Sequence, residues 1–276
     1  MSGWRRGLRC MSGRGKTSYR KNLFKKYPIL KIGVVAFVAT VVLLRIIIPI
    51  YETSDIITPI SVPVGAGAEV PECPSLIGKK LVALTFDDGP GTKTTPRLLD
   101  ILKKNNVCAT FFTLGGLAEQ NPEIVKREKD ECHEVASHTI SHSQLSKMSE
   151  SEIRWEIGTS ETILQNITGE KPTLLRPPYG VVNDAVQGVS DLSLILWSVD
   201  TLDWKYRNTE SIVGRAMEQV KDGGIILMHD IYETSVDAVE TLIATLRNEG
   251  YEFLTVSELA IVKGVELKAG EIYYHF

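Results

Sequence analysis

Short apolar runs alternate with amphipathic stretches from residue 81 to the end of the chain. The runs, such as residues 81–85, are rich in apolar and β-favouring residues and predict buried strands. The stretches between them, such as 94–104, repeat apolar residues at i, i+3 and i+4 and predict helices. Strands are expected at 81–85, 107–114, 134–137, 174–176, 194–199, 225–228 and 251–255, and helices at 94–104, 121–131, 150–167, 209–220, 235–248 and 256–261. The alternation predicts an α/β fold, a distorted (β/α) barrel with about seven parallel strands.

Residues 32–50 follow a different pattern, because they are almost continuously apolar and broken only by Arg45 near one end. As a helix they would span roughly 28 Å, close to the ~30 Å thickness of the hydrocarbon layer. The ten Lys and Arg residues of 1–31 all precede this run, so the positive-inside rule places the N-terminus in the cytoplasm. We expect a single N-terminal transmembrane helix. A cleaved signal peptide is the alternative, but its small-residue site, 66–68, lies far beyond the apolar run.

The remaining boundaries follow from composition and charge. Residues 1–31 form the expected basic cytoplasmic tail, 51–72 mix Pro, Gly and Ser as an extracellular stem does, and 73–276 form the folded domain. The chain has 31 basic and 34 acidic residues, and eleven of the basic residues but none of the acidic ones lie in 1–51. Residues 52–276 therefore hold 20 basic and 34 acidic residues, a net charge of −14. The basic end precedes a membrane segment, so we expect a membrane partner and no nucleic acid. No obligate protein partner is indicated.

The chain has four cysteines, of which Cys10 would be cytoplasmic and Cys73, Cys108 and Cys132 extracellular, where disulfides form. Three is an odd number, so at least one of them is free or pairs between chains. No Cys-x-x-Cys sequence is present, which argues against a zinc ribbon or a thioredoxin-like site.

Polar or ionisable residues recur at the ends of the expected strands. They are Asp87, Asp88, His138, Arg176, Asp200 and His229. In a β/α barrel the carboxyl ends of the strands form the active-site face, so we expect these side chains to converge. Asp87 and Asp88 are also followed by Gly-Pro, and an ordinary surface turn is the alternative for that pair alone.

His138 and His142 are spaced i, i+4, so on a helical turn they would face the same way and could bind one metal. Two ordinary surface or core histidines are the alternative. With Asp88 they would form a two-His, one-carboxylate site, which suits hydrolytic zinc and also non-haem iron.

Three further residues have chemistry that fits around such a metal. Asp87 would remain as a general base, and His229 would be a general acid, because imidazole titrates near neutral pH. Arg176 could pair with a carboxylate and hold it ionised. The alternative for Arg176 is a structural ion pair with Asp203.

Five segments resemble, in order and spacing, the five motifs of the polysaccharide deacetylases, which are carbohydrate esterase family 4 with its NodB-homology domain. The segments are Thr-Phe-Asp-Asp-Gly-Pro at 85–90, His-Thr-Ile-Ser-His at 138–142, Arg-Pro-Pro-Tyr-Gly at 176–180, Asp-Thr-Leu-Asp-Trp at 200–204 and Leu-Met-His at 227–229. The resemblance covers about residues 75–276. The anchored architecture is most similar to that of bacterial peptidoglycan N-acetylglucosamine deacetylases.

The resemblance implies a distorted (β/α) barrel with a substrate groove on its top face. It also implies that Asp88, His138 and His142 hold one divalent metal, usually Zn²⁺ and sometimes Co²⁺ or Ni²⁺. Asp87 matches the base that activates the attacking water, and His229 matches the acid that protonates the leaving amine.

The other site residues also take their roles from the resemblance. Arg176 matches the residue that orients the base, and the backbone N–H of Tyr179 matches the oxyanion donor. Asp203 matches the carboxylate that tunes the acidic histidine, with Asp200 as the alternative. Trp204 and Leu227, with Tyr179, match the walls of the substrate groove and acetyl pocket.

The chain departs from the family at two positions. Cys132 stands where the family often has Gly, and Ser137 stands where it often has Asn. Cys108 and Cys132 fall at the starts of consecutive parallel strands, so we expect a disulfide between them. A Cα separation beyond ~7 Å would exclude it.

The function expected from these observations is metal-dependent hydrolysis of N-acetyl groups on an extracellular polysaccharide, the N-acetylglucosamine of peptidoglycan, with release of acetate. The alternatives within the class are a chitooligosaccharide deacetylase and a xylan O-acetyl esterase. An inactive wall-glycan-binding module is the alternative from another class, and the retention of every candidate catalytic residue argues against it. An iron oxygenase would need a double-stranded β-helix, which the helix–strand alternation contradicts.

Overall fold

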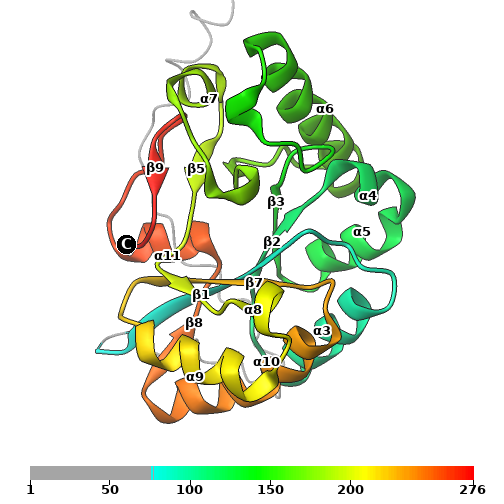
Figure 1. Cartoon of the computed structure of the whole chain (residues 1–276). Coiled ribbons are helices and arrows are strands. Elements are labelled where there is room, and N and C mark those ends of the chain that lie inside the picture. The colour runs from blue at the N-terminus through cyan, green and yellow to red at the C-terminus, as the bar shows by residue number, and fades with distance from the viewer. Residues whose placement is uncertain (1–75, 77) are drawn as a thin grey trace, which may run out of the picture. The chain divides into compact units, whose positions relative to one another are not determined.

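The computed structural model describes residue 76 and residues 78–276 (Figure 1). The expected tail at 1–31, transmembrane helix at 32–50 and stem at 51–72 lie outside the described residues. Among the residues that are described, none of the helices has the length and apolar character needed to cross a membrane.

One parallel sheet of nine strands organises the domain. Its strands are β1 (Lys80–Asp87), β2 (Thr110–Thr113), β3 (Glu134–Ser137), β4 (Leu174–Leu175), β5 (Ser193–Ile195), β6 (Val199–Asp200), β7 (Gly224–His229), β8 (Tyr251–Phe253) and β9 (Ile272–Tyr273). Their order is β6-β7-β1-β2-β3-β4-β5-β9, with β8 paired to β1. Every named strand pair is parallel, and the end strands β6 and β9 are not paired with each other among the described residues. The expected distorted, open β/α barrel is confirmed.

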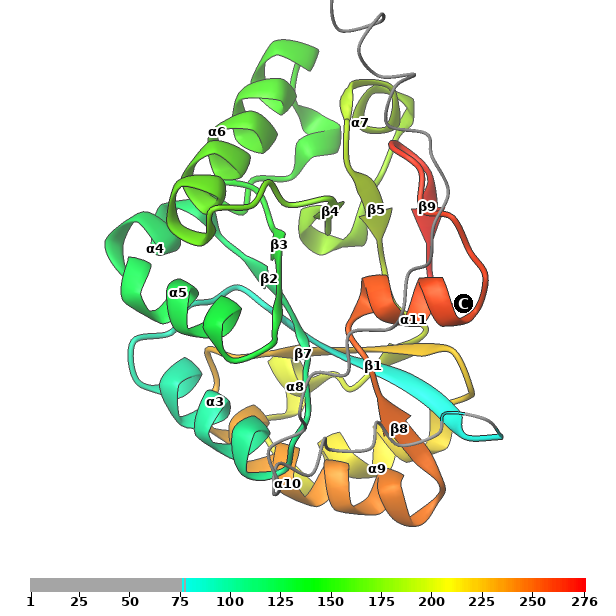
Figure 2. The same ribbon diagram turned by 180° about the vertical axis from the view of Figure 1, so that it is seen from behind.

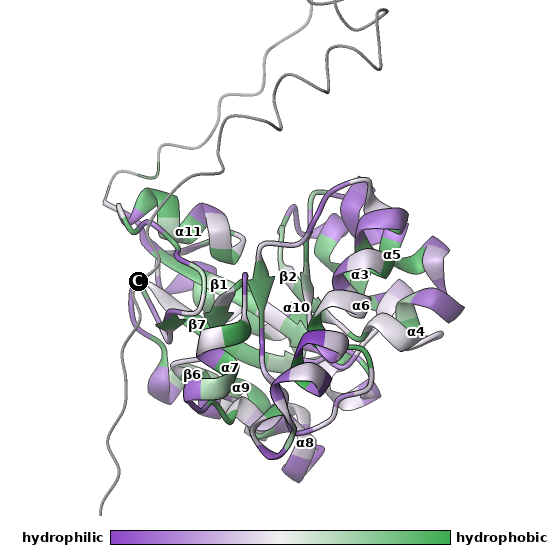
Figure 3. Cartoon of the chain, turned by 90° about the horizontal axis from the view of Figure 1, so that it is seen from above, coloured by the Kyte–Doolittle hydropathy of each residue, from purple (hydrophilic) through white to green (hydrophobic). Residues whose placement is uncertain are grey.

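Helices surround this sheet, most of them on its outside (Figures 1 and 2). They are α3 (Thr94–Lys104), α4 (Gly115–Gln120), α5 (Pro122–Asp130), α6 (Glu150–Thr168), α7 (Asp184–Val189), α8 (Asp203–Tyr206), α9 (Thr209–Gln219), α10 (Glu233–Asn248) and α11 (Val256–Val262), with 3₁₀ turns at Leu145–Lys147 and Pro178–Gly180. Strands β1 and β7 are mostly apolar, and outer helices such as α5 carry the polar residues (Figure 3).

The alternation of side chains along β1 explains why this strand is apolar on both faces. Val82, Leu84 and Phe86 pack into the cluster formed with the outer helices α3, α9 and α10. Leu81 and Ala83 point to the other face and pack in the barrel interior, with residues such as Ile225 of β7. Because both faces are covered, the strand contains no solvent-facing polar position, as is usual in parallel sheets.

The apolar run 194–199 forms two strands, so the expectation of one strand was wrong. Strand β5 pairs with β4 and β9, whereas β6 pairs with β7 at the opposite end of the sheet order. At the junction of the two strands, the carbonyls of Ile195 and Leu196 accept hydrogen bonds from the Arg176 side chain. Ser198 then forms hydrogen bonds with the backbone of Ile225 in β7. This split and the unpredicted β9 raise the strand count from about seven to nine.

The expected disulfide between Cys108 and Cys132 is confirmed, with a Cα separation of 5.6 Å. It joins the segments that lead into the neighbouring strands β2 and β3. Cys132 has φ of 75°, in the left-handed region that glycine adopts without strain, which explains why glycine is common at this position in the family. Ser137, the other departure, is buried, and its hydroxyl bonds to that of Ser160 on α6.

Candidate active site

A cavity of about 520 Å³ opens at the carboxyl ends of the strands. It is lined by Asp87, Asp88, His138, His142, Pro177, Tyr179, Gly180, Trp197, Asp200, Trp204, Leu227, His229 and Tyr232. Strand β1 ends at Asp87 and β7 ends at His229, and these two residues are direct partners in the parallel ladder. The structure therefore brings the motifs predicted from 85 to 229 together around one cavity.

Asp88, His138 and His142 form a cluster that can hold a metal ion, since their ligand atoms all lie within 4.8 Å of one another. The Oδ1 atom of Asp88 is 3.4 Å from Nε2 of His138 and 3.3 Å from Nε2 of His142. This Oδ1 atom is buried and has no hydrogen-bond partner. An unpaired carboxylate oxygen facing two imidazole nitrogens fits a divalent cation.

The protonation of His138 also suits metal binding. Its Nδ1 atom lies 2.6 Å from the carbonyl oxygen of Arg176. A carbonyl oxygen only accepts hydrogen bonds, so Nδ1 carries the proton and Nε2 presents its lone pair to the cluster. Burial alone would raise the pKa of Asp88, but the imidazoles of His138, His229 and His142 hold it below the usual value. Asp88 is therefore an anionic ligand at neutral pH.

His138 and His142 do not lie on a helical turn, so that expectation was wrong although both face the same cavity. Thr139 has φ of 69° and His142 has φ of 61°, which fold the segment into an irregular loop. Glu156 of α6 holds the loop: its Oε2 accepts from the backbone N–H groups of Ile140 and Ser141 at 3.2 and 3.1 Å. Its Oε1 accepts from the hydroxyl of Ser141 at 2.5 Å.

Glu156 is a site residue that sequence reasoning missed. It is buried, although it belongs to an otherwise regular amphipathic helix. The available signal was a carboxylate on the inward face of α6, three residues after the buried Ile153 and next to the buried Ile157. A buried carboxylate needs hydrogen-bond donors, and a loop carrying metal ligands supplies them.

Asp87 is buried and is held by Arg176, whose Nη1 donates to Asp87 Oδ1 at 2.6 Å. The guanidinium is fully buried and also donates to Thr85 Oγ1 at 2.8 Å and to the carbonyls of Ile195 and Leu196 at 3.1 and 3.0 Å. Burial lowers the pKa of Arg176, and the charge of Asp87 acts in the opposite direction. Arg176 thus contacts Asp87, and not Asp203 as the structural alternative required.

His229 is paired with Asp203, whose Oδ1 lies 2.8 Å from Nδ1 of the imidazole. Asp203 is buried and also accepts from the backbone N–H groups of His229 and Trp204 and from the Ser235 hydroxyl. Burial would lower the pKa of His229, but the hydrogen bond and charge of Asp203, aided by Asp87 and Asp88, raise it to about 9. His229 is thus an imidazolium at neutral pH. Its Nε2 lies 4.0 Å from Asp88 Oδ2.

Asp200, the alternative partner for His229, lines the cavity but makes a different contact. Its Oδ1 accepts from the backbone N–H of Leu202 at 2.8 Å. Tyr179 and Trp204 both line the cavity: the ring centroid of Tyr179 is 4.7 Å from that of His142, and Trp204 is half-exposed. Leu227 is buried and contributes to the cavity wall.

Comparison with known proteins agrees with this geometry. The family model described as polysaccharide deacetylase matches residues 77–194. The peptidoglycan-N-acetylglucosamine deacetylase PgdA of Listeria monocytogenes is 44% identical over 209 residues, which are 76% of this chain and 44% of that protein. A peptidoglycan-N-acetylglucosamine deacetylase of Bacillus cereus is 36% identical over 189 residues, which are 66% of this chain and 88% of that protein. The chain belongs to the polysaccharide deacetylase family.

Solved structures of the family have the same fold. A T48 deacetylase with substrate superimposes with a TM-score of 0.68 at 42% identity, over 71% of this chain and 96% of that one. A family 4 acetyl xylan esterase from Clostridium thermocellum, in complex with a cobalt ion, gives 0.69 at 34% identity, over 71% and 98%. The chain spans less than half the length of the Listeria relative, so the similarity concerns the domain described here.

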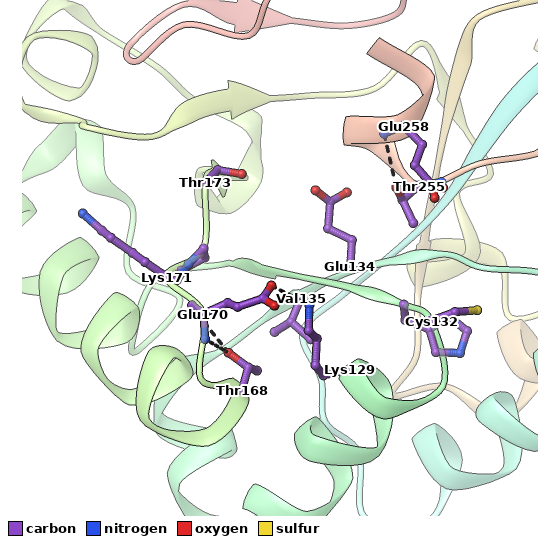
Figure 4. A pocket seen from close by; sticks show the side chains of 12 residues that line it. Lys129, Cys132, Glu134, Val135, Thr168, Glu170, Lys171, Thr173, Thr255 and Glu258 are labelled. Atoms are coloured by element: carbon purple, nitrogen blue, oxygen red, sulfur yellow. Dashed lines mark hydrogen bonds and ion pairs between the residues drawn. The ribbon is translucent and has the colours of Figure 1, made fainter. Parts of the chain in front are cut away.

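A second cavity, of about 260 Å³, lies at the amino ends of β3 and β4 (Figure 4). Lys129 and Glu170 point toward each other there and form an ion pair of 2.5 Å. Glu134 is engaged by the hydroxyls of Thr110 and Ser257. None of the residues expected at the active site lines this cavity. The charged side chains of Lys129, Glu170 and Glu134 have partners, and the candidate catalytic residues lie at the opposite ends of the strands.

Proposed function

We propose that this chain is a metal-dependent N-deacetylase that acts on the N-acetylglucosamine of peptidoglycan and releases acetate. One observation carries the proposal: the Asp88–His138–His142 cluster has two charged groups beside it. They are the carboxylate of Asp87, which is paired with Arg176, and the imidazolium of His229, which is paired with Asp203. Groups whose surroundings make one anionic and the other cationic are suited to act as base and acid. The names of the Listeria and Bacillus relatives support the substrate.

A divalent ion held by Asp88, His138 and His142 would supply Lewis acidity for the acetamide carbonyl and for water. The buried, unpartnered Asp88 Oδ1 and the free Nε2 lone pair of His138 support this ligand set. We infer Zn²⁺, which suits two imidazoles and one carboxylate, with Co²⁺ or Ni²⁺ as alternatives. The cobalt complex of the Clostridium thermocellum relative supports a divalent metal.

The side chains around the cluster then divide the proton transfers. Asp87 takes a proton from the attacking water, and Arg176 orients this carboxylate by donating to its Oδ1. As the C–N bond breaks, His229 donates its Nε2 proton to the leaving nitrogen, so the products are acetate and an amine. The backbone N–H of Tyr179 donates a hydrogen bond to the carbonyl oxygen as negative charge develops on it.

The remaining expected residues act on the substrate and the acid. Asp203 maintains the charge and orientation of His229. Trp204, Leu227 and the ring of Tyr179 form walls for the sugar and its acetyl group. In the cell we infer a single-pass membrane protein whose residues 32–50 span the bilayer, with 1–31 in the cytoplasm and 73–276 outside. The apolar run and the one-sided positive charge support this placement.

The proposal is tested by measuring acetate release by the full-length protein in detergent, with and without a chelator. The substrates are peptidoglycan, chitooligosaccharide and acetylated xylan at matched acetyl content. We expect chelator-sensitive release that is fastest from peptidoglycan. Preferential release from xylan would favour the O-acetyl esterase alternative. No release from any glycan by metal-loaded protein would favour an inactive wall-binding module.

The Asp203→Asn variant should lose activity at lower pH than the wild type. His229 must be protonated to act as an acid, so activity falls as pH rises through its pKa, which Asp203 raises to about 9. Without that carboxylate, burial dominates and lowers the pKa, so the alkaline limb of the kcat–pH profile should move down by about one unit or more. Asp200→Asn is the matched control, because Asp200 lines the same cavity without contacting His229. An unmoved limb in Asp203→Asn would remove Asp203 from this role.

A further inference from the structure

Three cationic side chains stand together beside the active site, on α8, on α9 and between these two helices. They are Lys205, Arg207 and Arg215. None of them forms an ion pair with the described residues, whereas other exposed cations such as Arg97 and Lys104 do. Residues 52–276 carry 20 basic and 34 acidic residues, so unpaired positive charge at one place is unusual for this domain. Cationic side chains that form no ion pair within the described residues can form one with a ligand.

Aromatic rings hold these cations in place. Tyr206 has the Lys205 ammonium 5.0 Å from its ring centroid and the Arg215 guanidinium 4.4 Å from it. The Arg207 guanidinium lies 3.0 Å from the centroid of the Tyr232 ring. Cation–π contacts fix the position of a guanidinium while leaving its N–H groups free at the edge. No hydrogen bond from these three side chains to any described residue is present.

This cation–aromatic surface, defined by Lys205, Tyr206, Arg207, Arg215 and Tyr232, is continuous with the active-site cavity. Tyr232 lines the cavity, and its ring centroid is 5.7 Å from that of His229. The ring of Tyr232 therefore contacts the Arg207 guanidinium and also lies next to the imidazole of the proposed acid, His229. Helices α8 and α9 lie next to β7, which carries His229 (Figure 1).

The chemistry of the surface indicates what it binds. Flat aromatic rings pack against the apolar faces of sugar rings, and the half-exposed Trp204, which precedes Lys205 and lines the cavity, offers such a face. Guanidinium groups bind carboxylates through paired, charge-assisted hydrogen bonds. A neutral glycan such as chitooligosaccharide would leave all three cations without a partner.

We propose that this surface binds a carboxylate carried by the sugar next to the one that is deacetylated. The inference rests on the proposed function and narrows its substrate to an anionic N-acetylated glycan. In peptidoglycan the carboxylate comes from the lactyl ether of the alternating N-acetylmuramic acid or from the attached peptide. Both sources present the same chemistry to Arg207.

The test compares three substrates that differ in charge. They are a peptide-free tetrasaccharide of alternating N-acetylglucosamine and N-acetylmuramic acid, its carboxamide derivative, and the same tetrasaccharide with its peptide. The measured quantity is the ratio of kcat/KM for the acid form to kcat/KM for the carboxamide. In Arg207→Gln this ratio should fall by about 10-fold, mainly because KM for the acid form rises, as expected when a charged hydrogen bond is lost. Added salt should reduce the same ratio in the wild type. Arg207→Lys should restore part of the loss, because it keeps the charge without the planar fork.

Arg154→Gln is the matched control. Arg154 is an exposed arginine on α6 that forms no ion pair among the described residues, so the substrate ratio should not change. A charge effect confined to the peptide-bearing glycan would identify the peptide carboxylate as the ligand. Equal losses on all three substrates in Arg207→Gln would overturn the inference and leave the proposed function standing. Failure of the wild type to release acetate from any of the three would overturn both.

Discussion

Replacing Asp88 with alanine should abolish divalent-metal binding and acetate release together. Asp88 supplies the only carboxylate of the cluster, and its Oδ1 faces both His138 and His142 within 3.4 Å. Two imidazoles alone bind a divalent ion weakly in water. The Lewis acidity of such an ion contributes several kcal/mol, so the rate should fall by at least about 10³-fold. Metal content of the purified protein and acetate release are the two measurements.

The controls for Asp88→Ala follow from its backbone. Asp88 has φ of 75°, which Asp and Asn tolerate better than Ala does. Asp88→Asn should therefore keep the native backbone while losing the anionic ligand, and should also lose metal affinity. Asp200→Ala removes a carboxylate from the same cavity outside the cluster and should retain the metal. Full activity of Asp88→Ala after the metal has been stripped would refute the assignment.

Long apolar runs made most of the fold predictable. The strands β1 and β7 are six or more residues long and buried over most of their length, so their sequences are mostly apolar. Elements of two to four residues, such as β9 and α8, have too few positions for a period to be recognised. The run 194–199 shows the complementary failure. Nothing in its composition indicates that the carbonyls of Ile195 and Leu196 accept hydrogen bonds from Arg176.

The identity of the site residues was predictable, but their pairing was not. Asp87 and Arg176 are 89 residues apart, and their contact depends on which strands are neighbours. From the residues alone, an ion pair of Arg176 with Asp203 remained as an alternative. The family resemblance favoured the contact with Asp87, and the structure agrees with it. The disulfide was predictable because strand starts that neighbour each other in a parallel sheet bring Cys108 and Cys132 together.

The loop that carries the metal-ligating histidines shows where spacing misleads. An i, i+4 pair suggests a helical turn, yet His138 and His142 converge on Asp88 from a loop with two positive φ angles. Glu156 supplies the hydrogen bonds that a helix would otherwise have provided. The spacing identified two residues that the fold brings together, but it did not reveal the backbone that presents them.

Replacing His229 with alanine should keep the metal and reduce the rate of amide hydrolysis by about 10²–10⁴-fold, the usual loss for a general acid. His229 lies outside the metal cluster, with Nε2 4.0 Å from Asp88 Oδ2. The fold should survive, because Asp203 would still accept three hydrogen bonds. The donors are the backbone N–H groups of residues 229 and 204 and the hydroxyl of Ser235. Metal content and thermal unfolding check both points.

The size of the loss in His229→Ala should depend on the leaving group. An amine leaves only when it is protonated, whereas the phenolate of an aryl acetate ester leaves without a proton. Acetate release from N-acetylated glycan should therefore fall far more than release from the ester, and the alkaline limb of the kcat–pH profile should disappear. Equal losses on both substrates would mean that His229 acts before the bond to the leaving group breaks, by positioning substrate or water, and not as the acid.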